Sequence, residues 1–333
     1  MRKTGFVIFA VILVFMLGGC TESLSPIFSS ADKRVQAQEK LSEIKELIKK
    51  EEFDKAFEES KSIVNSKYLT EDELNAIVVM FQNEDRFEEG LYLLNVLLLR
   101  DKNNDSTLNN LSWAYHMINK NESANLFADR ALAISSNSKY QFSNKANALR
   151  GLGKYEEAIE YYDKALAIAP DFSEAVWGKA MTYDDLEDYA RSLEFFIKYR
   201  ELKPDDEKST RYYITSCYRQ LGQLNNAIEE YESFYEQDKN DTSPLYSIAY
   251  IYYQEEEHDK ALEYFDKILG VEPDDAWAYY GMVDCYAKTD RMDEAISAMK
   301  KATEIDPYVL YEMYYLDEAD KIMSHKDFVT LFQ

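Results

Sequence analysis

The sequence contains few residues that make turns and few that make reactive sites. It has 10 Gly and 6 Pro in 333 residues, too few for a protein of many strands and tight turns. It has only 3 Cys and 3 His, and the histidines lie far apart in sequence, so neither a metal site nor a Cys–His nucleophile is indicated. Phosphate-binding glycine loops and serine-nucleophile motifs are also missing. The sequence therefore predicts no enzyme activity, no metal and no cofactor.

Basic residues are also scarce. There are 38 Lys and Arg against 62 Asp and Glu, a net charge of −24. This balance excludes nucleic acid as a partner, because binding to phosphates depends on Lys and Arg that displace counterions. It also disfavours acidic partners. The chain is 46% hydrophobic and rich in residues that favour helices, so we expect a folded, all-α protein.

The first twenty residues have the order of an export signal. Arg2 and Lys3 precede a run of twelve apolar residues, 6–17, and Gly18 and Gly19 lead to Cys20. Twelve apolar residues are too few for a membrane-spanning helix, which needs about twenty.

The stretch Leu17-Gly18-Gly19-Cys20 resembles the lipobox of bacterial lipoproteins. The resemblance implies that residues 1–19 are a signal peptide and that Cys20 receives a lipid. The protein would then be held at a cell membrane or an outer membrane, outside the cytoplasm. Residues 20–36, which include several serines, are predicted to form a flexible tether. An ordinary secretory signal with a chance cysteine, or an uncleaved anchor, remains an alternative.

The rest of the chain repeats every 34 residues. Small residues recur in steps of 34, with a single step of 35, at Ala56, Gly90, Ala124, Ala158, Ser192, Ala227, Ala261 and Ala295. Nine residues before each of them stands a large residue: Leu47, Phe81, Tyr115, Leu149, Tyr183, Tyr218, Tyr252 and Tyr286. Such a unit fits two helices joined by a tight turn, in which the small residue lets the second helix approach the first closely.

These features resemble the tetratricopeptide repeat. The unit 139–172 carries the family's pattern at Phe142, Ala146, Leu149, Ala158, Tyr162, Ala165 and Pro170. The resemblance implies a right-handed superhelical α-solenoid. Eight units are predicted over residues 37–309, and capping helices over residues 310–333.

In this family the groove is lined by fixed positions of the first helix of each unit. Carried onto this sequence, those positions give the following candidates for binding a partner: Trp113, His116, Tyr140, Asn147, Arg150, Trp177, Tyr212, Arg219, Tyr246, Tyr250, Tyr253, Trp277 and Tyr280. Asn109, Glu174, Asp184, Asp185 and Asp284 occupy further groove positions. The alternative is that the three tryptophans only fill gaps between neighbouring helices.

The preferred hypothesis is a non-catalytic adaptor, anchored by its lipid, that binds protein or peptide partners in this groove. The alternative is a lipoprotein that binds glycans or small solutes on the aromatic face. Cys217 and Cys285 stand at the same repeat position, two repeats apart, and are expected to be small core residues and not a disulfide.

Overall fold

The computed structural model describes residues 25–312, 316, 318–325 and 328. Within these ranges the fold is all-α, as predicted, and no β-strand occurs. The chain divides into two compact units, Met1–Leu186 and Glu187–Gln333. No described helix combines the length and the apolar character needed to cross a membrane. The predicted signal peptide and Cys20 lie outside the described residues.

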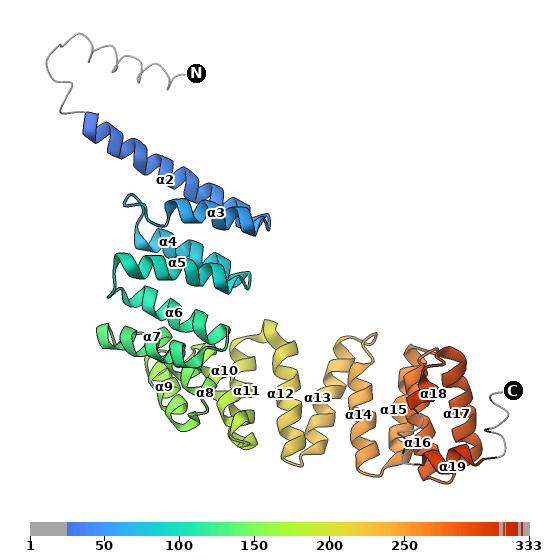
Figure 1. Cartoon of the computed structure of the whole chain (residues 1–333). Coiled ribbons are helices and arrows are strands. Elements are labelled where there is room, and N and C mark those ends of the chain that lie inside the picture. Colours follow the sequence, from blue (N-terminus) through green and yellow to red (C-terminus); the bar gives the residue numbers. More distant parts are fainter. Residues whose placement is uncertain (1–24, 313–315, 317, 326–327, 329–333) are drawn as a thin grey trace. The chain divides into compact units, whose positions relative to one another are not determined.

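Helices that alternate in direction form both units (Figure 1). The helices of the first unit are α2 (Ser25–Lys49), α3 (Phe53–Ile63), α4 (Glu71–Asn83), α5 (Phe87–Arg100), α6 (Asp105–Met117), α7 (Asn121–Ile134), α8 (Lys139–Gly151), α9 (Tyr155–Ile168) and α10 (Ser173–Asp185). The second unit contains α11 (Tyr189–Leu202), a short 3-10 helix (Pro204–Asp206), α12 (Glu207–Gln220), α13 (Leu224–Gln237), α14 (Ser243–Gln254), α15 (His258–Val271), α16 (Ala276–Lys288), α17 (Met292–Ile305), α18 (Val309–Glu312) and α19 (Ala319–Met323). The 3-10 helix coincides with the single repeat of 35 residues.

Even-numbered helices up to α16 are the first helices of the repeats, and we call them A helices; their odd-numbered partners up to α17 are B helices. Each A helix ends in a turn with one residue of left-handed backbone conformation. These residues follow the same period: Glu51, Asp85, Asn119, Gly153, Glu187, Gly222, Glu256 and Asp290. Only Gly153 and Gly222 adopt this conformation without steric cost.

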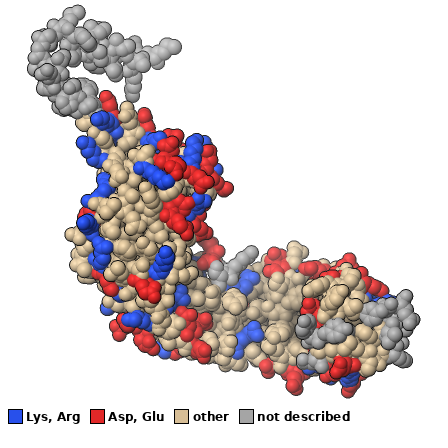
Figure 2. Space-filling model, in the orientation of Figure 1, with Lys and Arg blue, Asp and Glu red and all other residues tan. Residues whose placement is uncertain are grey.

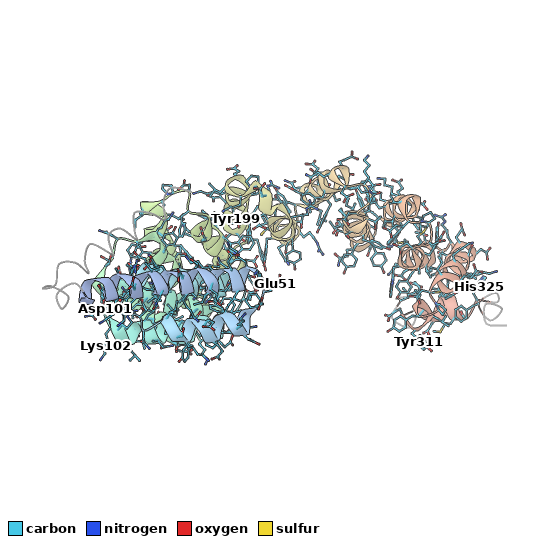
Figure 3. The ribbon with its side chains drawn as sticks, turned by 90° about the horizontal axis from the view of Figure 1, so that it is seen from above. Glu51, Asp101, Lys102, Tyr199, Tyr311 and His325 are labelled. Atoms are coloured by element: carbon cyan, nitrogen blue, oxygen red, sulfur yellow. The ribbon has the colours of Figure 1, made fainter. Side chains whose placement is uncertain are left out.

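A repeated backbone hydrogen bond closes the same turn. The amide of the residue after the left-handed position donates to the carbonyl five residues earlier, as from Lys154 to Leu149 at 2.9 Å and from Arg291 to Tyr286 at 2.8 Å. The acceptors belong to the predicted series of large residues. Figure 3 shows the result in the first unit, where the turn at Glu51 and the loop at Asp101 and Lys102 lie at opposite ends of the helices.

The small residues of the predicted series are buried at every one of their eight positions. A Cβ atom at Gly90 would lie only 3.1 Å from the side chain of Gln82 on the paired A helix. This confirms that close approach of the two helices requires a small residue there. The large series is less uniform, since Phe81 and Leu149 are buried whereas Tyr115 and Tyr218 are half-buried.

Buried lysines join neighbouring repeats in the first unit. The Nζ atom of Lys145 on α8 lies 2.7 Å from Asn125 Oδ1 and 2.5 Å from Asp129 Oδ1 on α7. One repeat later, Lys179 Nζ lies 2.5 Å from Asp163 Oδ1. A buried ammonium needs such a partner, so these pairs fix how one repeat stacks on the next.

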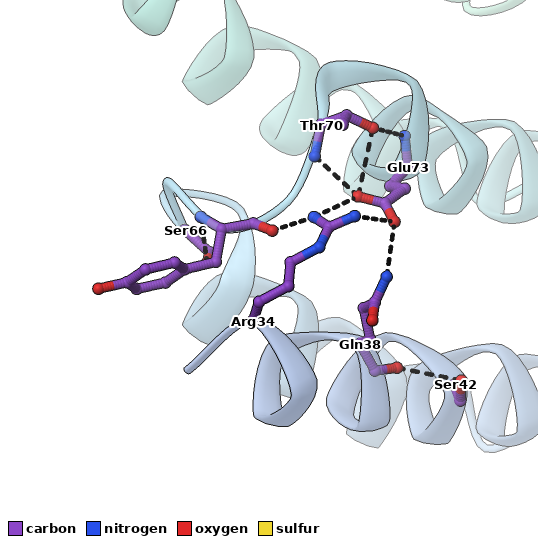
Figure 4. A network of polar contacts seen from close by, with 7 residues as sticks. Arg34, Gln38, Ser42, Ser66, Thr70 and Glu73 are labelled. Carbon is purple, nitrogen blue, oxygen red and sulfur yellow. Dashed lines mark hydrogen bonds and ion pairs between the residues drawn. The ribbon is translucent and has the colours of Figure 1, made fainter. Parts of the chain in front are cut away.

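The start of α2 corrects the predicted tether. Residues 25–36, expected to be flexible, lie within the helix. The guanidinium group of Arg34, on α2, donates to both carboxylate oxygens of Glu73 on α4, each at 2.8 Å, and to the carbonyl of Tyr68 (Figure 4). Glu73 also closes a capping box with Thr70 at the start of α4. The sequence pattern missed this contact because it joins residues in different repeats.

At the other end, the predicted capping segment contains the short helices α18 and α19. Val309 and Ile322 are buried, and Lys321 Nζ lies 2.5 Å from Asp290 Oδ1. Cys217 and Cys285 are buried free thiols, as predicted. Burial and the neighbouring Asp284 raise the pKa of Cys285 to about 12.

The Arg34–Glu73 contact gives a first prediction. Arg34→Ala should speed amide hydrogen exchange in α2 by about two- to five-fold, because a half-exposed ion pair contributes about 0.5–1 kcal/mol. Lys33→Ala is the matched control, since Lys33 is an exposed cation on the same helix. Equal exchange in the two variants would contradict the prediction.

The same contact should depend on pH. The Thr70 amide, together with Arg34, lowers the pKa of Glu73 to about 2. A lowered pKa stabilises the fold above the unfolded value, and the benefit is lost as the pH falls from about 4.5 toward 2. The difference in urea midpoint between the wild type and Glu73→Gln should therefore shrink over that range.

Candidate functional site

All of the predicted groove residues lie on A helices, but they are distributed over both units. Trp113, His116, Tyr140, Asn147, Arg150 and Trp177 belong to the first unit, on α6, α8 and α10. Tyr212, Arg219, Tyr246, Tyr250, Tyr253, Trp277 and Tyr280 belong to the second, on α12, α14 and α16. Each unit is therefore described as a site of its own.

In the first unit, α4, α6, α8 and the start of α10 form a cavity of about 400 Å³, which we call the asparagine pocket. Its lining consists of Val79, Gln82, Asn83, Asn109, Asn110, Trp113, Tyr140, Ser143, Asn144, Asn147, Phe172 and Glu174. Residues from different repeats share this pocket because the corresponding turns of successive A helices lie next to one another.

Hydrogen bonds hold the side-chain amides of the asparagine pocket in place. Asn144 Nδ2 donates to Asn109 Oδ1 at 2.9 Å, and the buried hydroxyl of Tyr162 donates to Asn147 Oδ1. The Nε2 atom of Gln82 is buried without a hydrogen-bond partner, so a donor is left for a ligand. This pocket can accept and donate hydrogen bonds, but it contains no nucleophile with an activating base.

Aromatic rings form the rim of the same pocket. Tyr140 packs edge-on against Phe172, with ring centroids 5.1 Å apart, and Trp113 packs against Phe87 at 5.6 Å. Lys139 places its ammonium 4.4 Å from the Phe172 ring centroid. The rim therefore offers fixed, flat surfaces beside the amide groups.

In the second unit, α14, α15 and α16 form a cavity of about 310 Å³, which we call the aromatic pocket. It is lined by Tyr246, Tyr250, Tyr253, Phe265, Trp277, Tyr280, Gly281, Asp284 and Leu316. A Cβ atom at Gly281 would lie 2.3 Å from the Phe265 ring, so only glycine admits this ring against α16. Gly178 stands at the equivalent position, where an added Cβ atom would lie 2.4 Å from the Tyr162 ring.

Two tyrosine hydroxyls of the aromatic pocket are hydrogen-bonded within the protein. Tyr253 donates its hydroxyl to Asp284 Oδ2, and Tyr280 donates to the carbonyl of Glu312 at 2.9 Å. Burial, with the nearby Glu312 carboxylate, raises the pKa of Tyr280 to about 12. Burial first, and Asp275 second, raise the pKa of Tyr246. Tyr246 and Tyr280 therefore stay neutral at physiological pH.

Some predicted residues line neither of these pockets. His116 Nδ1 lies 2.8 Å from Asn121 Oδ1, and burial lowers the pKa of this histidine. Arg150 pairs with Asp185 at 3.0 Å, and Trp177 is half-buried on α10. Tyr212 is exposed, and Arg219 lies 3.4 Å from Gln254 Oε1. Contact of any predicted residue with a partner stays a prediction.

Sequence reasoning did not select several lining residues. Asn144 and Gly281 stand one position away from the family's groove positions. Gly178 occupies the same repeat position as Gly281, and this recurrence of glycine could have indicated a close contact there. Phe265 comes from a B helix and Leu316 from the C-terminal segment, so no pattern of A-helix positions could include them. Among the described residues, no group of three His, Cys, Asp or Glu is placed to hold a metal ion.

Comparison with protein families identifies tetratricopeptide repeats in this chain. Tetratricopeptide-repeat models match residues 140–172, 216–270 and 252–308, and these are models of a repeat and not of an enzyme. A search of curated proteins finds no match.

A solved structure supports the fold. The C-terminal part of a TPR repeat-containing protein from Cytophaga hutchinsonii is 14% identical, with a TM-score of 0.57 over 77% of this chain and 98% of that chain. A tetratricopeptide repeat protein from Parabacteroides merdae is 18% identical, with a TM-score of 0.46 over 76% and 98% of the two chains. YrrB, described as a TPR protein with an unusual peptide-binding site, is 23% identical, with a TM-score of 0.40 over 57% and 98%.

Proposed function

Because the chain carries tetratricopeptide repeats, we propose that it is a non-catalytic scaffold that binds segments of partner proteins. One observation carries this proposal: A-helix positions of successive repeats combine into the asparagine pocket and the aromatic pocket. A pocket with fixed aromatic walls and a few placed polar groups is the usual form of a recognition site.

The asparagine pocket suits the backbone of an extended peptide. A peptide group has one donor and one acceptor, and an asparagine side chain offers both in a matching plane. Asn144 Nδ2 donates one such hydrogen bond to Asn109 Oδ1. The unpartnered Gln82 Nε2 supplies a donor for a peptide carbonyl, and Trp113 and Tyr140 supply apolar surface for side chains.

The negative charge of the chain restricts the kind of partner that it can bind. Acidic residues outnumber basic ones by 62 to 38, and Figure 2 shows them gathered where the α2–α3 and α4–α5 turns lie. Such a surface repels acidic proteins and nucleic acids and favours neutral or basic segments. The partner we propose is a protein or peptide that is not acidic.

Site-specific photo-crosslinking in the intact cell tests this function. A benzophenone amino acid at Tyr140 or Tyr250, each about half exposed at 53% and 51%, should give protein adducts. The matched control is Ile168 on the B helix α9, which is 48% exposed. Trp113→Ala should then weaken the adduct at position 140 by about tenfold, because hot-spot aromatic residues contribute 1 kcal/mol or more. Adducts of equal yield at all three positions would contradict the proposal.

We also propose that a lipid on Cys20 anchors the scaffold to a cell membrane or an outer membrane. The support is the lipobox-like stretch 17–20 at the end of a short apolar run. Two or more acyl chains on one residue are sufficient for stable anchoring.

Detergent phase partition tests the anchor. The full-length protein should enter the detergent phase, and Cys20→Ala should move it to the aqueous phase. Cys285→Ala is the control, because this buried thiol is not part of the lipobox. An unmodified Cys20 in the mass spectrum of the mature protein would show that the proposal is wrong.

One observation favours glycan binding as a second candidate function. The asparagine pocket sets Trp113 and Tyr140 beside Asn109 and Asn147, and flat rings with amides are also suited to sugars. Titration of the protein with a panel of oligosaccharides, followed by tryptophan fluorescence, distinguishes peptide binding from glycan binding. For a peptide scaffold we expect no saturable quenching, whereas saturable quenching that Asn147→Ala abolishes would establish the glycan function instead.

A further inference from the structure

We propose that the aromatic pocket between α14 and α16 recognises a cation, the ammonium or guanidinium group of a Lys or Arg side chain in the bound segment. The inference rests on the proposed scaffold function and specifies what one of its two pockets binds.

The carboxylate of Asp284 is the first observation. This residue lines the pocket and is only 5% exposed. Its Oδ2 atom accepts the Tyr253 hydroxyl, whereas its Oδ1 atom is buried without any hydrogen-bond partner. A buried carboxylate oxygen without a partner is costly, and a ligand with charged N–H donors would remove that cost. An apolar ligand has no donor for this oxygen, and an acidic ligand would be repelled by the carboxylate.

The orientation of the tyrosine hydroxyls is the second observation. Tyr253 and Tyr280 direct their hydroxyl groups to Asp284 and to the Glu312 carbonyl, so these polar ends are already used. The hydroxyl of Tyr246 has no hydrogen-bond partner, and the rest of what these tyrosines offer a ligand is ring surface. Tyr250 and Trp277, which are 51% and 45% exposed, extend that surface to the mouth of the pocket. The faces of such rings attract cations.

The apolar part of the lining fits the rest of a long basic side chain. Phe265, Gly281 and Leu316 offer no charge, and the missing side chain at Gly281 lets the Phe265 ring reach α16. Lys and Arg place their methylene groups along apolar surface while the charged end meets a polar partner. In this pocket the polar partner is Asp284.

The surrounding charges agree with this assignment. The chain's own Lys288 lies 5.6 Å from the Tyr253 ring centroid, but it is not among the residues that line the pocket. The acids beside the rings are Asp284, Asp275 at the start of α16, Glu272 near Tyr246 and Glu312 near Tyr280. The asparagine pocket differs, because its carboxylate, Glu174, is exposed to solvent.

The test uses purified full-length protein labelled with 5-fluorotryptophan, in which Trp277→Phe assigns the Trp277 fluorine resonance. The probes are acetyl-Gly-X-Gly amides in which X is Lys, Arg, norleucine or Glu. The Lys and Arg peptides should shift the Trp277 resonance and bind about tenfold more tightly than the norleucine peptide, because each factor of ten corresponds to about 1.4 kcal/mol. The Glu peptide should have no effect.

Asp284→Asn is the decisive variant, because asparagine keeps an acceptor for the Tyr253 hydroxyl and removes only the charge. It should reduce affinity for the Lys peptide about tenfold and leave the norleucine peptide within about twofold. Glu174→Gln is the matched control and should change neither. Trp277→Ala, at the exposed mouth, should also lose the Lys peptide, as shown by calorimetry, with its helical circular dichroism unchanged.

Three results would overturn the inference: equal binding of Lys and norleucine, a Lys preference that survives Asp284→Asn, or no shift of Trp277 with any peptide. If crosslinks at Tyr140 persist in such a case, the scaffold function stands and only the cation pocket fails. If crosslinks at Tyr140 and Tyr250 do not exceed those at Ile168 either, both proposals fail together.

Discussion

The turn that ends each A helix is the constraint on which the other features depend. One residue in the left-handed conformation and a hydrogen bond across five residues reverse the chain within a few residues. The B helix then returns along its partner, and a small residue such as Ala158 lets the two helices touch. Six of the eight left-handed residues are not glycine, so packing of the helix pair must outweigh their steric cost.

Repetition of that turn also produces the pockets. Because each repeat places its A helix next to that of the previous one, side chains at nearby repeat positions meet across helices. Where these positions hold amides, as at Asn109 and Asn144, the pocket is polar. Where they hold Tyr246, Tyr250 and Tyr280, it is aromatic. The same scaffold therefore presents two chemically different sites without changing its backbone.

The prediction from sequence was most accurate where the physics is local. The period, the small residues and the buried cysteines were confirmed, since each follows from close packing inside one repeat. The tether was wrong over residues 25–36, where Arg34 binds Glu73 in the next repeat. The residues predicted for the groove lie on A helices, and their binding role stays a prediction. The pattern could not show that His116 and Arg150 have partners of their own, Asn121 and Asp185.

The spacing of small and large residues is sufficient to predict the all-α repeat, because the pairing of helices with a 34-residue period depends on close packing inside one repeat. Which of those residues form a site depends on contacts between distant parts of the chain. Phe265 enters the aromatic pocket from a B helix, and Leu316 from beyond the repeats. One oxygen of Asp284 is paired with Tyr253 whereas the other has no partner. Burial and the pairing of individual atoms depend on neighbours that are distant in sequence, and no periodic pattern records them.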